Sequence, residues 1–122
     1  MSTLKLDTLS NKAGTASVPS DTIVSGTAKA WVNFNGTGTV AIRRAFNVSS
    51  ITDISTGDYR VNLTNAMSDA NYAVVTGSRQ DDTYIDRYLS AKVENTSSFR
   101  LYSANYSIGY YDSTYAYAAV FS

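Results

Sequence analysis

The amino-acid sequence predicts an all-β protein, an antiparallel β-sandwich or small barrel of seven to eight strands with a short N-terminal arm. Two observations carry this prediction. Runs of alternating apolar and polar residues recur along the chain, separated by clusters of Gly, Asn, Asp and Ser, as in short strands joined by turns. Ser, Thr and Asn also supply 40 of the 122 residues, and these side chains hydrogen-bond to nearby backbone at bends.

The first 27 residues differ from the rest. Leucines at positions 4, 6 and 9 indicate a short strand, and the small polar stretch 11–17 reads as a linker. We therefore expect an N-terminal strand or arm with a linker at 1–27, serving attachment or oligomerisation, and an antiparallel β-sandwich domain at 28–122. The alternative is that the first strand is an edge strand of that domain.

The first half of the β-domain reads as strands separated by clear turns. Residues 30–34 alternate strictly, and Asn-Gly at 35–36 turns the chain into a second strand at 39–48, which together predict a hairpin. Residues 59–63 follow the Thr-Gly-Asp turn and alternate like a half-buried strand. Residues 65–70 are expected to form a brief helical turn or loop.

The second half contains four further strand patterns. Residues 72–76 are expected to form a strand buried on both faces, and 83–94 and 99–103 two more. The last strand, 114–122, carries Tyr, Ala and Phe on one face and Ala and Val on the other, with no charge on either. Such a strand should lie inside a sheet, covered on both sides or packed against a neighbouring subunit.

Composition excludes several classes of function. Ten basic and ten acidic residues balance, which argues against nucleic-acid binding. The chain has no Cys and no His, so it has no disulfide, no thiolate metal site and no imidazole base. No apolar run has the roughly 20 residues that span a bilayer, and the start does not resemble a signal peptide. We predict no cofactor, no metal site, no membrane insertion, no catalytic residue, and synthesis in a cytoplasm.

Acidic residues offer two weaker interpretations. Asp81, Asp82 and Asp86 are close enough in sequence for a calcium site, but Arg79 and Arg87 flank them, which favours a salt-bridged surface loop. Paired carboxylates hydrolyse glycosides, but the only glutamate, Glu94, has no evident second acid or groove beside it. The sequence therefore indicates a binding or structural protein rather than an enzyme.

Tyrosine is the unusual residue, because eight of the ten fall between positions 84 and 117. Phenol rings combine a stiff apolar face with one polar group, which suits recognition surfaces. Tyrosines beside polar turns are therefore candidates for binding a partner, and the rings stack on sugar faces while Asn and Asp bind hydroxyl groups. The candidate receptor-binding residues are Tyr102, Asn105, Tyr106, Tyr110, Tyr111 and Asp112. The alternative is that these rings only pack.

A second set of apolar residues is a candidate interface with other subunits or with a larger assembly, because the arm needs a partner and the last strand needs a cover. These residues are Leu4, Leu6, Leu9, Tyr115, Tyr117 and Phe121.

Residues 29–78 also resemble a segment of bacteriophage tail-fibre and related virion proteins, especially of marine and cyanobacterial phages. The resemblance rests on Lys-Ala-Trp-Val-Asn-Phe-Asn-Gly, then Gly-Thr-Gly-Thr, then Thr-Gly-Asp-Tyr, in this order. A looser similarity covers residues 4–14. It implies a non-enzymatic virion structural protein, usually a homotrimer, whose N-terminal part faces the particle and whose β-domain faces outward. The Met start and short length suggest a complete small protein.

Three functions follow from these observations. The leading one is a tail-fibre or tail-associated adhesin of the virion, assembled in the host cytoplasm with other tail or capsid proteins, which contacts a host-surface glycan through its tyrosines. The alternative is a capsid decoration protein (a head fibre or cement protein), in which the arm grips the shell. A third is a free bacterial lectin that binds sugar without any virion partner.

Overall fold

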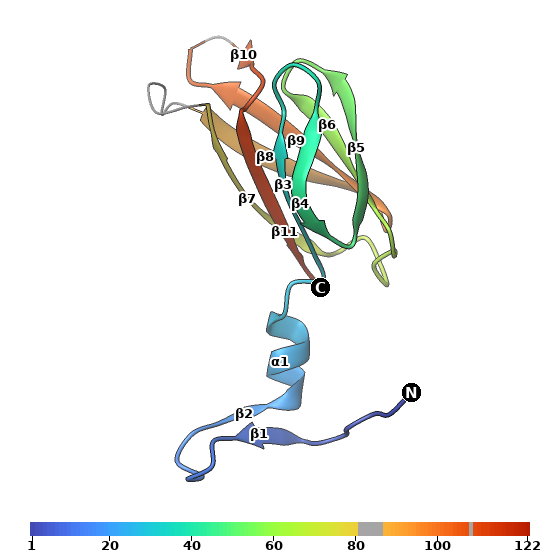
Figure 1. Ribbon diagram of the computed structural model, residues 1–122, viewed down its shortest axis with the longest axis vertical. Helices are drawn as coiled ribbons and strands as arrows, with labels where there is room; N and C mark the ends of the chain where they lie inside the picture. Colours follow the sequence, from blue (N-terminus) through green and yellow to red (C-terminus); the bar gives the residue numbers. More distant parts are fainter. Residues whose placement is uncertain (81–86, 108) are drawn as a thin grey trace.

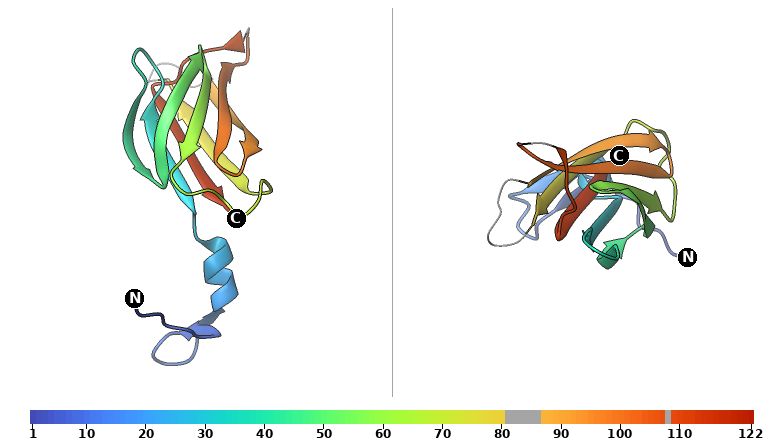
Figure 2. Two further views of the ribbon diagram at one scale, coloured as in Figure 1. Left: turned by 90° about the vertical axis from the view of Figure 1, so that its right-hand side faces the viewer. Right: turned by 90° about the horizontal axis from the view of Figure 1, so that it is seen from above.

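The computed structural model describes residues 1–80, 87–107 and 109–122 and confirms the all-β prediction. Its main body is a sandwich of two antiparallel sheets, not a closed barrel (Figures 1 and 2). One sheet, called here the β11 sheet, has the strand order β4-β3-β11-β7. The other, the β9 sheet, has the order β10-β9-β6-β5, with β8 on the opposite side of β9.

The strand bounds follow the predicted pattern in most places. The β11 sheet contains β3 (Ala30–Asn35), β4 (Ala41–Phe46), β7 (Ala73–Arg79) and β11 (Tyr115–Phe121). The β9 sheet contains β5 (Val48–Ser55), β6 (Asp58–Leu63), β8 (Arg87–Asn95), β9 (Ser98–Asn105) and β10 (Gly109–Tyr110). The predicted hairpin at 30–48 is β3 paired with β4, and residues 65–70 form a loop.

The core lies between the two sheets, where the predicted alternation places apolar side chains inward. Val61 and Leu101 are fully buried, and the rings of Phe34 and Tyr59 meet edge to face at 5.2 Å between centroids. Phe34 comes from the β11 sheet and Tyr59 from the β9 sheet, so this aromatic pair joins the two layers. Edge-to-face aromatic contacts of this kind add about 1 kcal/mol beyond the buried area.

Two predictions about the strands are wrong. The sequence analysis has no strand at Val48–Ser55, yet β5 forms there, because the chain turns at Asn47 (φ 55°) and pairs again with β6. It also expects the strand at 72–76 to be buried on both faces. Val75 is 55 % exposed, because β7 is an edge strand whose outer face has no layer above it among the described residues. The described part of the sandwich has four strands in one sheet and five in the other, more than the seven to eight expected.

The N-terminal arm is more ordered than a plain linker. β1 (Thr8–Ser10) and β2 (Ser17–Pro19) pair with each other and with no other described strand, and α1 (Ser20–Gly26) follows. Figure 1 shows this arm projecting from one end of the sandwich, beside the C-terminus. The first strand is therefore not an edge strand of the sandwich.

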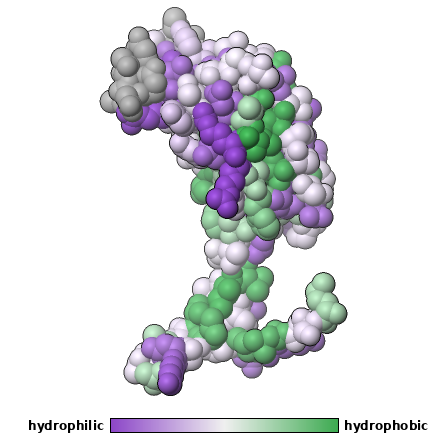
Figure 3. All heavy atoms as spheres, in the orientation of Figure 1, coloured by the Kyte–Doolittle hydropathy of each residue, from purple (hydrophilic) through white to green (hydrophobic). Residues whose placement is uncertain are grey.

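Apolar side chains on the arm face solvent. Leu4 is 85 % exposed, Leu9 53 % and Val24 62 %, and no residue of α1 is buried. The hydrophobic colour in Figure 3 follows the arm on the face shown. No helix of the described residues is long and apolar enough to cross a bilayer.

Candidate functional site

Four tyrosines gather on the outer face of the β9 sheet, at the end opposite the arm. Tyr102 lies on β9, Tyr88 on β8 and Tyr110 on β10, and Tyr106 follows the end of β9. The strand register explains the gathering, because Ala104 of β9 is paired with Tyr88 on one side and with Tyr110 on the other. Paired residues project on the same face of a sheet, so the four rings surround Ala104.

The four rings form two tilted pairs. Tyr88 and Tyr106 lie 5.7 Å apart between ring centroids, and Tyr102 and Tyr110 lie 6.2 Å apart. Tyr106 is 83 % exposed and Tyr110 61 %, whereas Ala104 beneath them is only 5 % exposed. We call Tyr88, Tyr102, Tyr106, Tyr110 and the covered Ala104 the tyrosine platform. It presents aromatic surface to solvent at the tip of the molecule.

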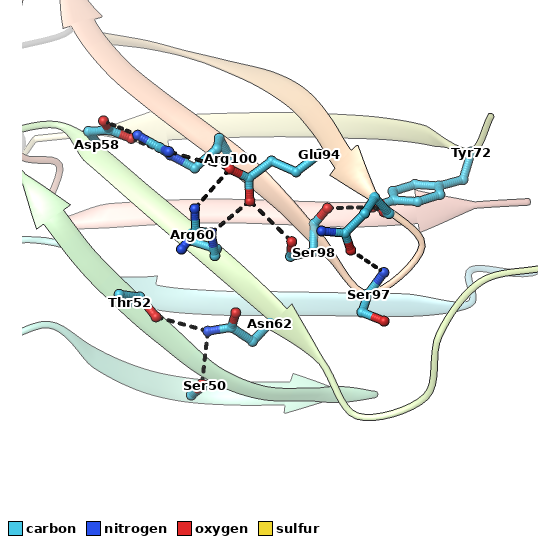
Figure 4. A network of polar contacts seen from close by, with 11 residues as sticks. Ser50, Thr52, Asp58, Arg60, Asn62, Tyr72, Glu94, Ser97, Ser98 and Arg100 are labelled. Carbon is cyan, nitrogen blue, oxygen red and sulfur yellow. Dashed lines mark hydrogen bonds and ion pairs between the residues drawn. The ribbon is translucent and has the colours of Figure 1, made fainter. Parts of the chain in front are cut away.

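Figure 4 shows an ion-pair network, which lies on the same face of the sheet as the platform because Asp58 is paired with Tyr102. The Arg60 guanidinium donates to Glu94 at 2.7 and 3.0 Å, and Arg100 Nη1 donates to the same carboxylate at 3.3 Å. Arg100 also pairs with Asp58 through Nε at 2.8 Å and through Nη2. The Arg100 guanidinium lies 5.5 Å from the ring centroid of Tyr102, which connects the network to the platform.

The network fixes the charge state of Glu94. The guanidinium of Arg60 lowers the pKa of the Glu94 carboxyl to about 2, against desolvation, and Ser98 and Arg100 lower it further through hydrogen bonds. A general acid for glycoside hydrolysis needs the opposite, a raised pKa. Glu94 is therefore an ionised structural carboxylate at neutral pH.

A buried hydrogen-bond cluster supports the same end of the sandwich from inside. Asp112 Oδ1 accepts hydrogen bonds from the Tyr59 hydroxyl at 2.9 Å and from the Gly57 amide at 2.8 Å. The Gly36 carbonyl oxygen lies 3.1 Å from the same hydroxyl oxygen. Burial, together with the bond to Asp112, raises the pKa of Tyr59 well above its ordinary value. The cluster joins both sheets to the segment that leads from β10 to β11.

Close packing around Gly57 explains the glycine at that turn. Gly57 has φ +67°, and an added Cβ would lie within 3 Å of the backbone of Tyr111. The Ser103 hydroxyl on β9 and the Ser113 hydroxyl in the segment between β10 and β11 are buried and 2.5 Å apart. The predicted Thr-Gly-Asp turn therefore packs directly against the backbone of Ser103 and Tyr111 at the tip of the sandwich.

The structure divides the six predicted receptor-binding residues into two groups. Tyr102, Tyr106 and Tyr110 lie together in the platform. The other three lie apart from it: the Tyr111 ring lies under Arg87, with 4.7 Å between Arg87 Cζ and the ring centroid, and Asn105 Oδ1 accepts from the Ser107 amide at 3.2 Å. Asp112 belongs to the buried cluster.

The six predicted interface residues lie on two exposed surfaces. Leu4, Leu6 and Leu9 are on the arm. Tyr115 and Tyr117 are on the outer face of β11, 39 % and 42 % exposed, and the half-buried Phe121 shares their face. β11 lies inside its sheet, as predicted, but only its inner face is covered by the described chain.

Sequence reasoning missed two parts of these surfaces. Tyr88 falls in the predicted strand 83–94 but is not among the predicted binding residues, although Leu89 beside it points inward and alternation then turns Tyr88 outward. A shallow apolar groove on the β11 sheet is lined by Trp31, Val75 and Tyr117, among others. This groove forms because β3, β11 and β7 are neighbours in the sheet. The alternation of apolar and polar residues within one strand does not reveal that order.

No cluster of His, Cys, Asp or Glu that suits a metal ion occurs within the ranges that the structure describes. The acidic cluster Asp81, Asp82 and Asp86 lies outside those ranges, as does Tyr84. In comparisons with protein families, with curated proteins and with solved structures, the chain matches none of them.

Proposed function

We propose that this protein is a bacteriophage virion structural protein, a tail-fibre or tail-associated adhesin that contacts the host surface. The observation that carries the proposal is the separation of two surfaces along the molecule. The exposed leucines Leu4 and Leu9 lie at one end, and the exposed tyrosines Tyr106 and Tyr110 at the other. An adhesin needs this polarity, because one end must be anchored while the other reaches its target.

The sequence resemblance over residues 29–78 supports the assignment to a virion. In the proposed assembly the arm attaches to other tail or capsid proteins, and the neutral outer face of β11 packs against neighbouring subunits of a homotrimer. Exposed apolar side chains such as Leu4 and Val75 favour association, because each buried Å² of apolar surface contributes about 25 cal/mol.

A capsid decoration protein is the second candidate, and the arm is the observation that favours it. The apolar side chains Leu9 of β1 and Ile23 and Val24 of α1 are all exposed, so the arm suits a binding site on a shell. In that case the sandwich is mainly a cap, and the tyrosines need no ligand.

Localisation on intact particles tests the proposal and separates the two candidates. We expect antibody against this chain, followed by immunogold labelling or cryo-EM, to mark the tail. We also expect purified protein to compete with particles for adsorption to host cells. Label on the capsid lattice would support decoration, and label on neither structure would contradict a virion role.

A further inference from the structure

We propose that the tyrosine platform and a row of polar side chains beside it form a binding track for a neutral polysaccharide. The polar row consists of Arg60, Asn62, Glu94 and Arg100. The inference rests on the proposed function, because it names the ligand class of the surface through which the adhesin contacts its host. In this track pyranose rings stack on the tyrosines, while their hydroxyl groups meet the polar side chains of β6, β8 and β9.

The platform offers the surface that a sugar ring needs. A pyranose ring has an apolar C–H face edged by hydroxyl groups, and a phenol ring has an apolar face with one hydroxyl group. The paired rings of Tyr88 with Tyr106 and of Tyr102 with Tyr110 hold one another in place at tilts of 46° and 44°. Little side-chain entropy is therefore lost when a ligand binds.

The length of the track favours a polymer over a single sugar. Outward-facing positions continue along β9 from Tyr106 through Tyr102 to Arg100. At about 3.3 Å per residue this distance is roughly 20 Å, which exceeds one sugar ring several times. Asn62 on β6, whose amide donates to Ser50 and Thr52 at 3.0 Å, extends the polar row sideways (Figure 4).

The charges beside the platform favour a neutral ligand. Arg60 and Arg100 are matched by Asp58 and Glu94 within one network, so these four side chains carry no net charge. A charged sugar would have to compete with the ion pairs that these four side chains already make with one another. Lys92 is exposed opposite Arg100 in the register, and the test therefore includes an anionic polymer.

The chemistry of this face disfavours a protein partner. Protein–protein interfaces are depleted in Lys, Glu and Asp, whereas here Asp58 and Glu94 lie in the network beside the platform and the exposed Lys92 is paired with Arg100. The exposed Phe46 and Val75, by contrast, lie on the β11 sheet. Polar and charged side chains adjoin the tyrosines of the platform, and this combination suits sugar.

Affinity electrophoresis of the full-length protein tests the inference, using native gels that contain dextran, mannan or the anionic alginate. We expect at least one neutral polymer to retard the protein. Tyr102→Ala and Tyr106→Ala should each weaken binding roughly tenfold, the equivalent of about 1.4 kcal/mol. Tyr102→Phe should keep most of the affinity, because it keeps the ring. Phe46→Ala, an exposed aromatic on the other sheet, is the matched control and should bind like wild type.

Three results would overturn the inference: retardation by neither neutral polymer, retardation unchanged in both alanine variants, or retardation by alginate alone. Tyr106 is mostly exposed, so Tyr106→Ala folds and a loss of binding is not a loss of structure. The proposed virion role is tested separately, by localisation on particles. If the protein were absent from virions but still retarded in a tyrosine-dependent way, the polysaccharide track would stand and the protein would be a free lectin.

Discussion

Arg60 of β6 and Arg100 of β9 are directly paired across the β9 sheet, and a single carboxylate, Glu94, binds both. Like charges placed opposite each other on neighbouring strands repel. The register of β8 against β9 shifts between Val93 and Asn95, and Glu94 is the residue at that irregularity. Its side chain reaches both guanidiniums across β9, so the irregularity in β8 supplies the carboxylate that this arginine pair requires.

Glu94→Gln should lower stability at neutral pH. The pKa of Glu94 is about 2 in the folded protein, below its ordinary value of 4.5. The ionised carboxylate therefore stabilises the fold above about pH 4.5, and that contribution is lost as the pH falls towards 2. Because the network is partly exposed, we expect a loss of about 1–2 kcal/mol at pH 7. Urea unfolding at pH 7, 4 and 2.5 measures it.

The difference between wild type and Glu94→Gln should shrink steadily towards the lowest pH. Asp53→Asn, which removes an exposed carboxylate of β5 outside the network, is the control and should change stability little. An equal loss at all three pH values would show that the carboxylate charge is not the cause.

Gly57→Ala should destabilise the protein more than Gly38→Ala. Both glycines have positive φ, +67° and +60°, but an added Cβ at Gly57 would meet the backbone of Ser103 and Tyr111, and at Gly38 nothing lies within 4 Å. Gly38→Ala should cost about 1 kcal/mol for the backbone alone, and Gly57→Ala about 3 kcal/mol or more. Thermal unfolding of both variants measures the difference, and equal costs would contradict the close packing at Gly57.

Tyr59→Phe should cost about 1–3 kcal/mol, because it removes the buried hydroxyl group that donates to the Asp112 carboxylate. Tyr106→Phe removes the same group from an 83 % exposed side chain and should leave the stability unchanged. Denaturant unfolding of the two variants compares them. If both were neutral, the buried cluster would not hold the tip of the sandwich together.

Tyr117→Arg should weaken self-association, because it places a charge in the apolar groove that Trp31, Val75 and Tyr117 line on the β11 sheet. Sedimentation velocity over a range of concentrations should show wild type as an oligomer and the variant shifted towards monomer. Tyr106→Arg is the control on the other sheet and should sediment like wild type. A monomeric wild type would contradict the proposed use of this face.

The sequence was sufficient to predict most of the sandwich. Strict alternation located β3, β6, β9 and β11, because a strand with one buried face must repeat every two residues. It failed at β5, where the pattern Val-Ser-Ser-Ile-Thr-Asp-Ile-Ser is largely exposed and polar. It also failed at α1, whose seven residues are held by no buried contact and so leave no apolar periodicity.

The amino-acid sequence by itself determined the all-β class, the inward and outward faces of the main strands, and the uncharged character of β11. These properties are local, since they depend on residues two positions apart. Tertiary structure alone decided which tyrosines meet. Tyr88 and Tyr110 lie 22 positions apart in the sequence and flank Ala104 only because β8 and β10 both pair with β9. In the same way, the pairing of β6 and β8 with β9 placed Glu94 between two arginines. Strand order and register bring such distant residues together, and neither is encoded in the alternation of a single strand.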